Sequence, residues 1–274
     1  MNTPPASRGR VLLVGAGPGD PELLTLKAMR AIAAADVILL DDLVNRAVLA
    51  HAPAGVRMIE VGKRGGCKST PQAFIQRLML QEAQAGRTVV RLKGGDPCLF
   101  GRGGEEAEFL AAHGVGVEVV PGITSGLAAP MAAGISVTHR DASPGVIFVT
   151  GHEKDEGHER IDWAALAASG LTLVVYMGVA NCARLCARLI DGGLPADTPT
   201  AAIQHATLPQ QRSVTSPLHT LPAALARAGI GSPAILVIGA VARSAQHAAA
   251  LAAGQVATRE ATQGFAAQSA AGVG

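Results

Sequence analysis

The chain has 274 residues, of which 49% are hydrophobic but only 3% aromatic, so its core must be built mainly from Ala, Val, Leu and Ile. That inventory favours helices packed on strands. A formal net charge of +2 without a basic run argues against nucleic-acid binding, and four cysteines are too few for a disulfide framework in a chain this long. Cys182 and Cys186 are one helical turn apart, but no second pair completes a zinc site, so we expect buried or half-buried thiols.

The sequence shows no secretory signal, because residues 1–10 are polar and lack an apolar segment. The most apolar stretch, residues 123–137, is interrupted by Gly126, Pro130 and Gly134, which makes it a poor membrane span. We therefore expect a cytoplasmic protein that does not bind a membrane.

The first half of the chain alternates short apolar runs with amphipathic segments. The first expected helix has Asp20 as its N-cap and Pro21 at its first position, and apolar spacing over residues 23–32 supports it. Alternation of strand and helix implies a mainly parallel sheet covered by helices. The expected strands are residues 11–14, 37–40, 57–61, 88–92 and 115–120, and the further helices are residues 71–85, 105–113 and one that opens at 121–125.

The second half begins after a polar, turn-rich segment at residues 138–145 and predicts a second α/β domain with a mixed sheet. Its expected strands are residues 146–150, 171–176, 200–203, 234–238 and a short one at 211–215, and its expected helices are residues 163–168, 181–190 and 221–228. The domain organisation that follows is a disordered tail (1–9), an N-terminal α/β domain (10–139), a C-terminal α/β domain (140–243) and an Ala-rich flexible tail (244–274).

Residues 89–106 are the most informative segment, and they read VVRLKGGDPCLFGRGGEE. A β-branched run ends at a Gly-Gly-Asp-Pro turn, two glycine turns follow, and a helix then opens at Glu105. Such a loop lets a ligand approach the backbone closely. Because it also carries Lys93, Asp96 and Arg102, we expect it to bind a polar, charged small molecule.

Loops that follow parallel strands cluster at one edge of the sheet, where ligands bind. The expected loops with unusual chemistry at this edge are residues 15–20, 41–44, 62–66, 94–104 and 121–125. In the first of them, Asp20 stands where a dinucleotide fingerprint has its third glycine, and a carboxylate there would repel a pyrophosphate. A Rossmann-type methyltransferase turn or a purely structural turn stays open for this loop, and Pro18 fits either dinucleotide or methyltransferase use poorly.

Several charged side chains near this edge have both a functional and an ordinary interpretation. Asp41 is either a base facing a cleft or part of a solvated turn with Asp42. The cations Lys63 and Arg64, or Lys93 and Arg102, either bind substrate carboxylates or form a solvated face. In the segment between the domains, Arg140 either reaches an anionic substrate or braces the two domains in an ion pair.

Taken in chain order, these motifs resemble the uroporphyrinogen-III C-methyltransferases, within the wider tetrapyrrole methyltransferase superfamily. The resemblance runs from about Arg10 to Arg243, and the long glycine-acid segment is its most specific part. The segments that carry it are residues 14–27, 61–64, 89–97, 100–106, 119–125, 138–141, 149–154 and 176–178.

The resemblance implies two α/β domains, a homodimer, and S-adenosylmethionine bound in an interdomain cleft, with S-adenosylhomocysteine as product. The residues that it implies for catalysis are Asp41 and Lys63 as base and acid, with Arg102 and Glu105; those for substrate binding are Lys63, Arg64, Arg102 and Arg140; those for the cofactor are Pro18, Gly94, Gly95, Asp96, Leu99, Thr124, Ser125, Met177 and Ala206.

The implied reaction methylates uroporphyrinogen III at C2 and then C7, giving precorrin-2 through precorrin-1 for sirohaem, cobalamin or haem d1. The many carboxylates of this substrate call for Arg and Lys contacts. Since the sulfonium methyl is already activated, no metal is expected, and the enzyme mainly aligns carbon, methyl and sulfur and excludes water. A proton must leave the attacked ring system, assisted by Asp41 or by an arginine–carboxylate arrangement at Arg102 and Glu105.

Two alternatives remain open: a later precorrin methyltransferase, and a non-catalytic module that binds tetrapyrrole or S-adenosylmethionine. The departures from the family pattern motivate them. Leu40 replaces a usual tyrosine, Asp42 a usual arginine and Ala142 a usual tyrosine, while Gln204-His205 replaces Glu-Asn. The change at Asp42 puts one carboxylate contact in doubt, whereas none of the departures falls in the cofactor loops.

Overall fold

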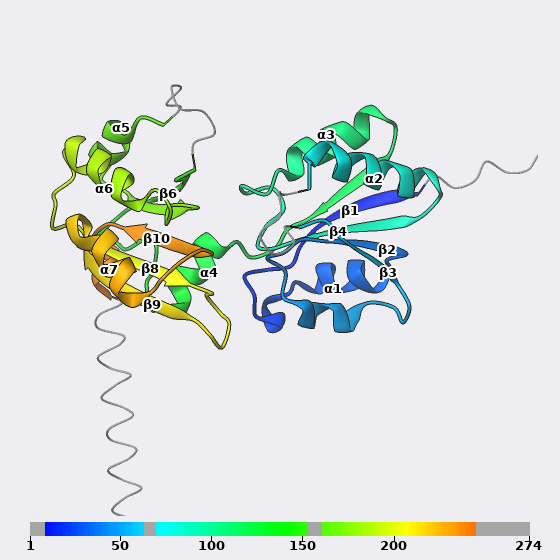
Figure 1. Cartoon of the computed structure of the whole chain (residues 1–274), viewed down its shortest axis with the longest axis horizontal. Helices are drawn as coiled ribbons and strands as arrows, with labels where there is room; N and C mark the ends of the chain where they lie inside the picture. The colour runs from blue at the N-terminus through cyan, green and yellow to red at the C-terminus, as the bar shows by residue number, and fades with distance from the viewer. Residues whose placement is uncertain (1–8, 63–69, 153–160, 245–274) are drawn as a thin grey trace, which may run out of the picture. The chain divides into compact units, whose positions relative to one another are not determined.

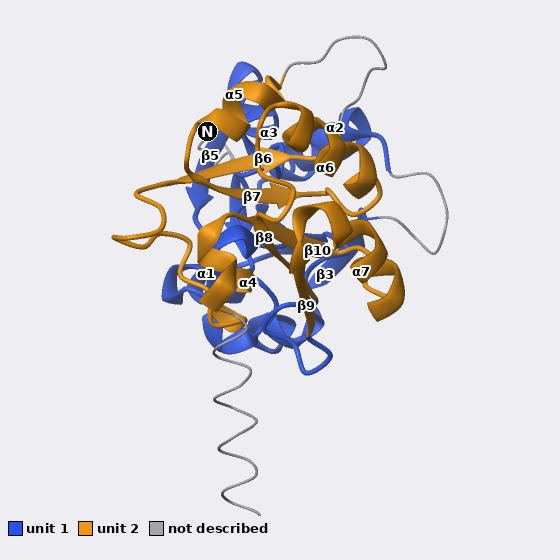
Figure 2. Ribbon diagram, turned by 90° about the vertical axis from the view of Figure 1, so that its left-hand side faces the viewer, with its two compact units in different colours: residues 1–128, 205–211 blue, residues 129–204, 212–274 orange. Residues whose placement is uncertain are grey.

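The computed structural model describes residues 9–62, 70–152 and 161–244, and it divides the chain into two compact units (Figure 2). Unit 1 comprises Met1–Ala128 and His205–Gln211, and unit 2 comprises Ala129–Gln204 and Arg212–Gly274. Compactness does not test which segments fold independently, so the domains expected over residues 10–139 and 140–243 stay predictions. Apart from Gly9 and Ser244, the two expected tails lie outside the described residues.

Unit 1 contains a five-stranded parallel sheet with the strand order β3-β2-β4-β1-β5 (Figure 1). Its central strands are buried on both faces, which is typical of a parallel sheet covered by helices on both sides. The expected parallel sheet is therefore confirmed. The strand bounds are β1 Arg10–Gly15, β2 Val37–Leu40, β3 Arg57–Glu60, β4 Thr88–Lys93 and β5 Gly116–Val120.

Two apolar clusters fix the helices of unit 1 to opposite faces of this sheet, as Figure 1 shows. Ile75 and Met79 of α2 pack with Leu110 of α3 on one face, whereas Ile32 of α1 and Val48 of η2 pack on the other. The bounds are η1 Pro21–Leu23, α1 Leu26–Ala33, η2 Arg46–His51, α2 Gln72–Gln84 and α3 Gly103–Ala112.

The start of the first helix differs from the sequence expectation. Asp20 does act as a cap, accepting a hydrogen bond from the Glu22 amide, but it caps only the short 3-10 turn η1. Leu24 is extended, and α1 begins after Thr25, whose hydroxyl accepts from the Ala28 amide. The expectation of one helix that starts at Pro21 and continues to Ile32 is wrong, because two capping residues, Asp20 and Thr25, divide the segment.

Unit 2 contains a five-stranded mixed sheet with the order β6-β7-β10-β8-β9, in which only β6 and β7 pair in parallel. Trp163 of α5, Leu185 of α6 and Leu225 of α7 pack together on this sheet in one apolar cluster. The mixed second sheet is as expected. The bounds are β6 Val146–Thr150, α5 Trp163–Ala168, β7 Thr172–Tyr176, α6 Cys182–Asp191, β8 Pro199–Gln204, β9 Arg212–Pro217, η3 Leu218–Thr220, α7 Leu221–Ala228, β10 Ala234–Ile238 and η4 Ala240–Arg243; α4, Ser125–Ala132, contains the division between the units.

Cys182 and Cys186 of α6 are buried free thiols with their sulfur atoms 3.9 Å apart, as the sequence predicts. Across residues 9–62, 70–152 and 161–244, no three His, Cys, Asp or Glu side chains gather as metal ligands would. None of the helices within these ranges has the length and hydropathy needed to cross a bilayer.

Candidate active site at the carboxyl edge of the first sheet

Three loops that follow β1, β4 and β5 are joined through close glycine contacts. Gly17 and Gly95 exchange backbone hydrogen bonds of 3.2 and 2.7 Å, and both have left-handed φ angles, of 75° and 65°. A side-chain carbon on Gly122 would lie 2.2 Å from the Gly95 carbonyl oxygen and 2.8 Å from the Gly15 Cα. The three loops can therefore meet only where these positions lack a side chain. We call the close contact of Gly15, Gly95 and Gly122 the glycine junction.

The Asp96 carboxylate connects two of these three loops by hydrogen bonds. Its Oδ1 accepts hydrogen bonds from the amides of Cys98 at 2.8 Å and Leu99 at 3.2 Å, and its Oδ2 accepts from the Gly122 amide at 3.2 Å. These bonds tie the loop after β4 to the loop after β5. Asp96, predicted to bind the cofactor, is thus positioned first of all to fix the shape of the loop.

Residues 205–211 leave the second sheet and belong to unit 1, which brings the predicted cofactor residue Ala206 to this unit. Thr207 Oγ1 accepts a 3.0 Å hydrogen bond from the Asp20 amide, in the loop after β1 that also carries Pro18. The Leu208 side chain contacts Gly19, where an added side-chain carbon would meet it at 2.9 Å. Residues 205–211 therefore contact the loop after β1 at Gly19 and Asp20.

The start of α4 completes the group of loops. A side-chain carbon on Gly95 would lie 3.7 Å from the Ser125 amide nitrogen and 3.8 Å from the Thr124 Cα. All the predicted cofactor residues except Met177 thus lie in unit 1, on the segments that follow β1, β4 and β5 or in residues 205–211. Met177 belongs to unit 2, where it follows β7 with an exposed side chain and a left-handed φ of 55°.

Asp41, which follows β2, contacts two cations that project from β4. Its Oδ2 lies 3.0 Å from Arg91 Nη2 and 3.9 Å from Lys93 Nζ, and its Oδ1 accepts a 2.9 Å hydrogen bond from the Asp42 amide. Behind these cations, Glu106 Oε1 of α3 lies 3.3 Å from Arg91 Nε and 3.6 Å from Lys93 Nζ. We call Asp41, Arg91, Lys93 and Glu106 the buried charge cluster.

The ammonium of Lys93 faces this cluster, so it is not turned outward to bind a substrate carboxylate as one interpretation of the sequence proposed. Burial, followed by the neighbouring Arg91 guanidinium, lowers the pKa of Lys93 against the opposing effects of Glu106 and Asp41. The protonated form is therefore less favoured in the folded chain than in the unfolded chain.

This shift predicts a pH dependence of stability. Since the pKa of Lys93 is lower in the folded state, the unfolded chain binds more protons between that value and the ordinary value of 10.5. We expect the unfolding free energy of the wild-type chain to rise relative to Lys93→Met as the pH increases through this window. Urea titrations of both proteins at several alkaline pH values measure the difference, and a flat or falling difference would contradict the assignment.

Arg102 and Glu105 pair with each other at the start of α3. Arg102 Nε lies 3.0 Å from Glu105 Oε1, and Nη2 lies 2.6 Å from Oε2, so the guanidinium and carboxylate are bidentate. Arg102 has a left-handed φ of 60°, which is uncommon outside glycine. The hydrogen bond to Glu105 raises the pKa of Arg102, and both side chains remain accessible at the surface.

The remaining predicted site residues are Lys63, Arg64 and Arg140. Lys63 and Arg64 lie outside the described residues. Arg140 is exposed in unit 2. Asp42 is exposed, and its carboxylate lies against Gly62, where an added side-chain carbon would stand 2.0 Å from Oδ1.

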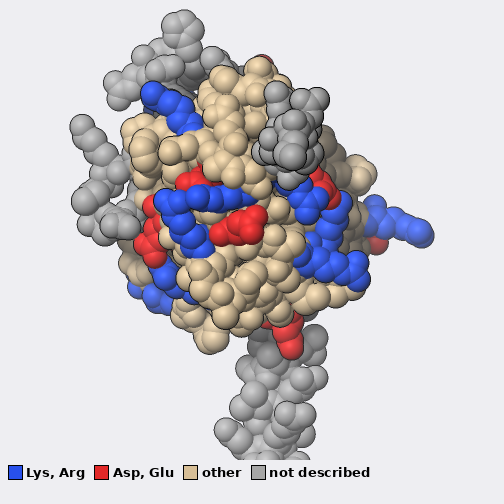
Figure 3. All heavy atoms as spheres, turned by 90° about the vertical axis from the view of Figure 1, so that its right-hand side faces the viewer, with Lys and Arg blue, Asp and Glu red and all other residues tan. Residues whose placement is uncertain are grey.

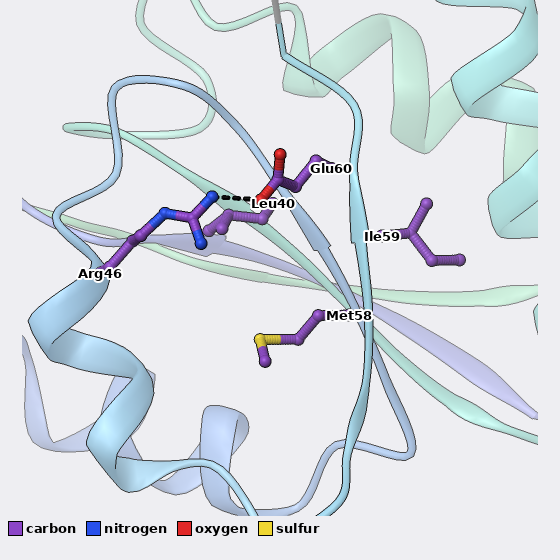
Figure 4. Close-up of a pocket in the computed structure, with 5 residues that line it drawn as sticks. All are labelled: Leu40, Arg46, Met58, Ile59 and Glu60. Carbon is purple, nitrogen blue, oxygen red and sulfur yellow. Dashed lines mark hydrogen bonds and ion pairs between the residues drawn. The ribbon is translucent and has the colours of Figure 1, made fainter. Parts of the chain in front are cut away.

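A cavity of about 300 Å³ opens beside β2 and β3, lined by Leu40, Arg46, Met58, Ile59 and Glu60 (Figure 4). Arg46 reaches from η2 to pair with Glu60, whereas Ile59 points to the other side of β3. None of the predicted site residues that the structure describes lines this cavity. Figure 3 shows basic and acidic side chains beside one another on one face of the molecule, which fits the small net charge.

Sequence reasoning missed Arg91, Glu106 and Gly122 as site residues. Both Arg91 and Glu106 belong to the informative segment of residues 89–106. The signal for Arg91 is a charged residue in the middle of an apolar strand. Gly122 follows β5 directly, and its position in the Pro-Gly-Ile-Thr-Ser motif marked a close backbone approach.

Comparison with known proteins gives consistent matches. Residues 10–222 match the family described as tetrapyrrole (corrin/porphyrin) methylases. The chain is 59% identical to the uroporphyrinogen-III C-methyltransferase of Pseudomonas aeruginosa, covering 86% of this chain and 95% of that protein, and 48% identical to that of Bacillus subtilis, covering 85% and 91%. The crystal structure of uroporphyrin-III C-methyl transferase from Thermus thermophilus complexed with S-adenyl homocysteine matches with a TM-score of 0.73 and 44% identity, covering 86% of this chain and 99% of that one.

Proposed function

This chain belongs to the tetrapyrrole (corrin/porphyrin) methylase family, and we propose that it transfers methyl groups from S-adenosylmethionine to C2 and then C7 of uroporphyrinogen III. The product is precorrin-2, formed through precorrin-1, for sirohaem, cobalamin or haem d1. The observation that carries the proposal is the glycine junction of Gly15, Gly95 and Gly122, which belongs to the same unit as all the cofactor positions implied by the resemblance except Met177. The relatives named as uroporphyrinogen-III C-methyltransferases support the substrate.

The residues at the junction fit S-adenosylmethionine, which when bound supplies a methyl group already activated on a sulfonium. Gly94 and Gly95 offer backbone without side chains, and Ser125 brings a hydroxyl group beside Gly95, next to the Thr124 backbone. Asp96 keeps this loop in shape through its three backbone hydrogen bonds. This chain's contribution is to hold the cofactor in a fixed orientation and to exclude water from the methyl group.

A large, partly apolar and polyanionic substrate needs both apolar contacts and cations. Leu43 and Phe100 are exposed on the loops after β2 and β4, and Ile123 is exposed on the loop after β5. Arg102 pairs with Glu105 at the surface, where an ion pair contributes little, so its guanidinium can exchange this partner for a substrate carboxylate. Arg140, Lys63 and Arg64 are the further proposed cations.

Loss of a proton completes each substitution on the ring, and we assign its removal to Asp41. This carboxylate lies at the carboxyl edge of the sheet and is one-third exposed, with its Oδ2 held by Arg91. Lys63, with Arg102 and Glu105, completes the proposed catalytic set. The proposal also includes a cytoplasmic homodimer, and light scattering of the purified protein tests the dimer.

The reaction is tested by its stoichiometry. The protein is incubated anaerobically with uroporphyrinogen III and S-adenosylmethionine, and S-adenosylhomocysteine is measured by chromatography. We expect two molecules of S-adenosylhomocysteine for each tetrapyrrole consumed. Release with a later precorrin but not with uroporphyrinogen III would instead identify a later precorrin methyltransferase. Binding of S-adenosylhomocysteine by calorimetry without turnover of either substrate would identify a non-catalytic binding module.

A further inference from the structure

The buried charge cluster has a graded exposure that ends at Asp41. The exposed fraction of the side chain is 0% for Glu106, 3% for Arg91, 6% for Lys93 and 33% for Asp41. Of these four groups, Asp41 alone reaches the surface, at the edge of the sheet where the loops meet. The other three lie beneath it, between β4 and α3.

The position of the cluster is costly for the fold. Arg91 and Lys93 alternate with Leu92 along β4, so they share a face with Val89, which packs in the apolar cluster of α2 and α3. Glu106 Oε1 accepts a 2.8 Å hydrogen bond from Gln72 Nε2, in addition to its contacts with the two cations. Within the described part of the chain, however, Glu106 Oε2 and Arg91 Nη1 are buried without a hydrogen-bond partner.

Buried ion pairs seldom stabilise a fold more than apolar side chains of similar size would, and unsatisfied buried polar atoms add to the cost. Stability therefore does not account for these charges. Their geometry suggests another role, because the Arg91 guanidinium uses Nε toward Glu106 and Nη2 toward Asp41, and so bridges the two carboxylates. A planar guanidinium held at both ends fixes the direction of each partner.

We propose that Glu106 is a positioning residue that acts through Arg91 and Lys93 to hold the Asp41 carboxylate in the orientation that removes the proton from the substrate. This inference rests on the proposed function, and it adds Arg91, Lys93 and Glu106 to the groups on which turnover depends. Glu106 itself does not touch the substrate, because its side chain is fully buried.

A double-mutant cycle tests the proposal, because a group that acts through Asp41 has no effect once Asp41 is neutral. We expect Glu106→Gln to lower kcat by about 10- to 100-fold, as misplacement of a catalytic group does, while the Kd for S-adenosylhomocysteine stays unchanged. In the Asp41→Asn background the same substitution should leave kcat unchanged. Equal fold-changes in both backgrounds, or no loss in the wild-type background, would overturn the proposal.

A matched control comes from the opposite edge of the same sheet. Glu82 of α2 is a second buried carboxylate with two arginine partners, Arg57 at the start of β3 and Arg87 just before β4. Glu82→Gln should lower the melting temperature but leave kcat at the wild-type value. A loss of kcat in this variant as large as that in Glu106→Gln would show that any buried charge matters, and would overturn the positioning role.

If Glu106→Gln does not fold, Arg91→Lys replaces it in the cycle, because lysine keeps the charge but cannot bridge two carboxylates with a planar fork. The same loss of kcat, absent in the Asp41→Asn background, is expected. Failure of the proposed function is distinguishable, since the wild-type enzyme would then form no methylated tetrapyrrole. With wild-type turnover present, additive effects would overturn the positioning role alone.

Discussion

Asp41→Asn is expected to lower kcat for uroporphyrinogen III methylation by roughly 10²- to 10⁴-fold, the usual contribution of a positioned general base. Asparagine keeps the shape of the side chain and a carbonyl oxygen for Arg91, but it cannot take up a proton. The affinity for S-adenosylhomocysteine should change little, because Asp41 lies on the loop after β2 and the glycine junction is formed by the loops after β1, β4 and β5. Steady-state kinetics and calorimetry measure the two effects.

The neighbouring Asp42→Asn is the control, because it removes the same charge from the same loop. The Asp42 side chain is exposed and lies against Gly62, outside the buried charge cluster. We expect wild-type kcat for this variant. Similar losses in both variants would point to the net charge of the loop, and full activity of Asp41→Asn would remove Asp41 as the base.

Gly122→Ala is expected to weaken cofactor binding while disturbing only one edge of unit 1. The added carbon would lie 2.2 Å from the Gly95 carbonyl oxygen and 2.8 Å from the Gly15 Cα, and these backbone atoms cannot turn away as a side chain would. The loops must separate, at a cost of about 3 kcal/mol of stability. We expect the affinity for S-adenosylhomocysteine, measured by calorimetry, to fall by more than roughly tenfold, since each 1.4 kcal/mol is a factor of ten.

Gly116→Ala provides the matched comparison, since Gly116 is the first residue of the same strand, β5, and an added carbon there meets nothing within 4 Å. Its cofactor affinity should equal that of the wild-type chain. Wild-type binding by Gly122→Ala would mean that the three loops do not need their close contact, and would remove the glycine junction as the basis of the site.

Much of the fold follows from local patterns in the sequence. The strands Val37–Leu40, Val146–Thr150 and Ala234–Ile238 have the expected bounds, because short apolar runs between turn residues define buried strands. The start of α1 does not follow from periodicity, because Thr25 competes successfully with Asp20 as the cap. The membership of residues 205–211 in unit 1 also depends on tertiary contacts, such as the bond from the Asp20 amide to Thr207.

The sequence was enough to predict the glycines of the site, but not the buried charge cluster. Gly94 and Gly95 stand out because backbone turns leave a local signature. The contact of Arg91 with Asp41 joins residues 50 positions apart, and it exists because β2 and β4 are neighbours in the sheet. The order of strands cannot be read from one charged residue in an apolar run. The sequence therefore leaves Lys93 open between a substrate contact and a solvated face, whereas its ammonium faces Asp41 and Glu106 in the structure.

The structure of the product tests the proposed methylation of uroporphyrinogen III. Uroporphyrinogen III is incubated anaerobically with the enzyme and S-adenosylmethionine carrying a ¹³C-labelled methyl group, and the tetrapyrrole is analysed by mass spectrometry and carbon NMR. We expect two added methyl groups, at C2 and C7. A tetrapyrrole recovered without added methyl groups, from enzyme that binds S-adenosylhomocysteine, would contradict the proposal.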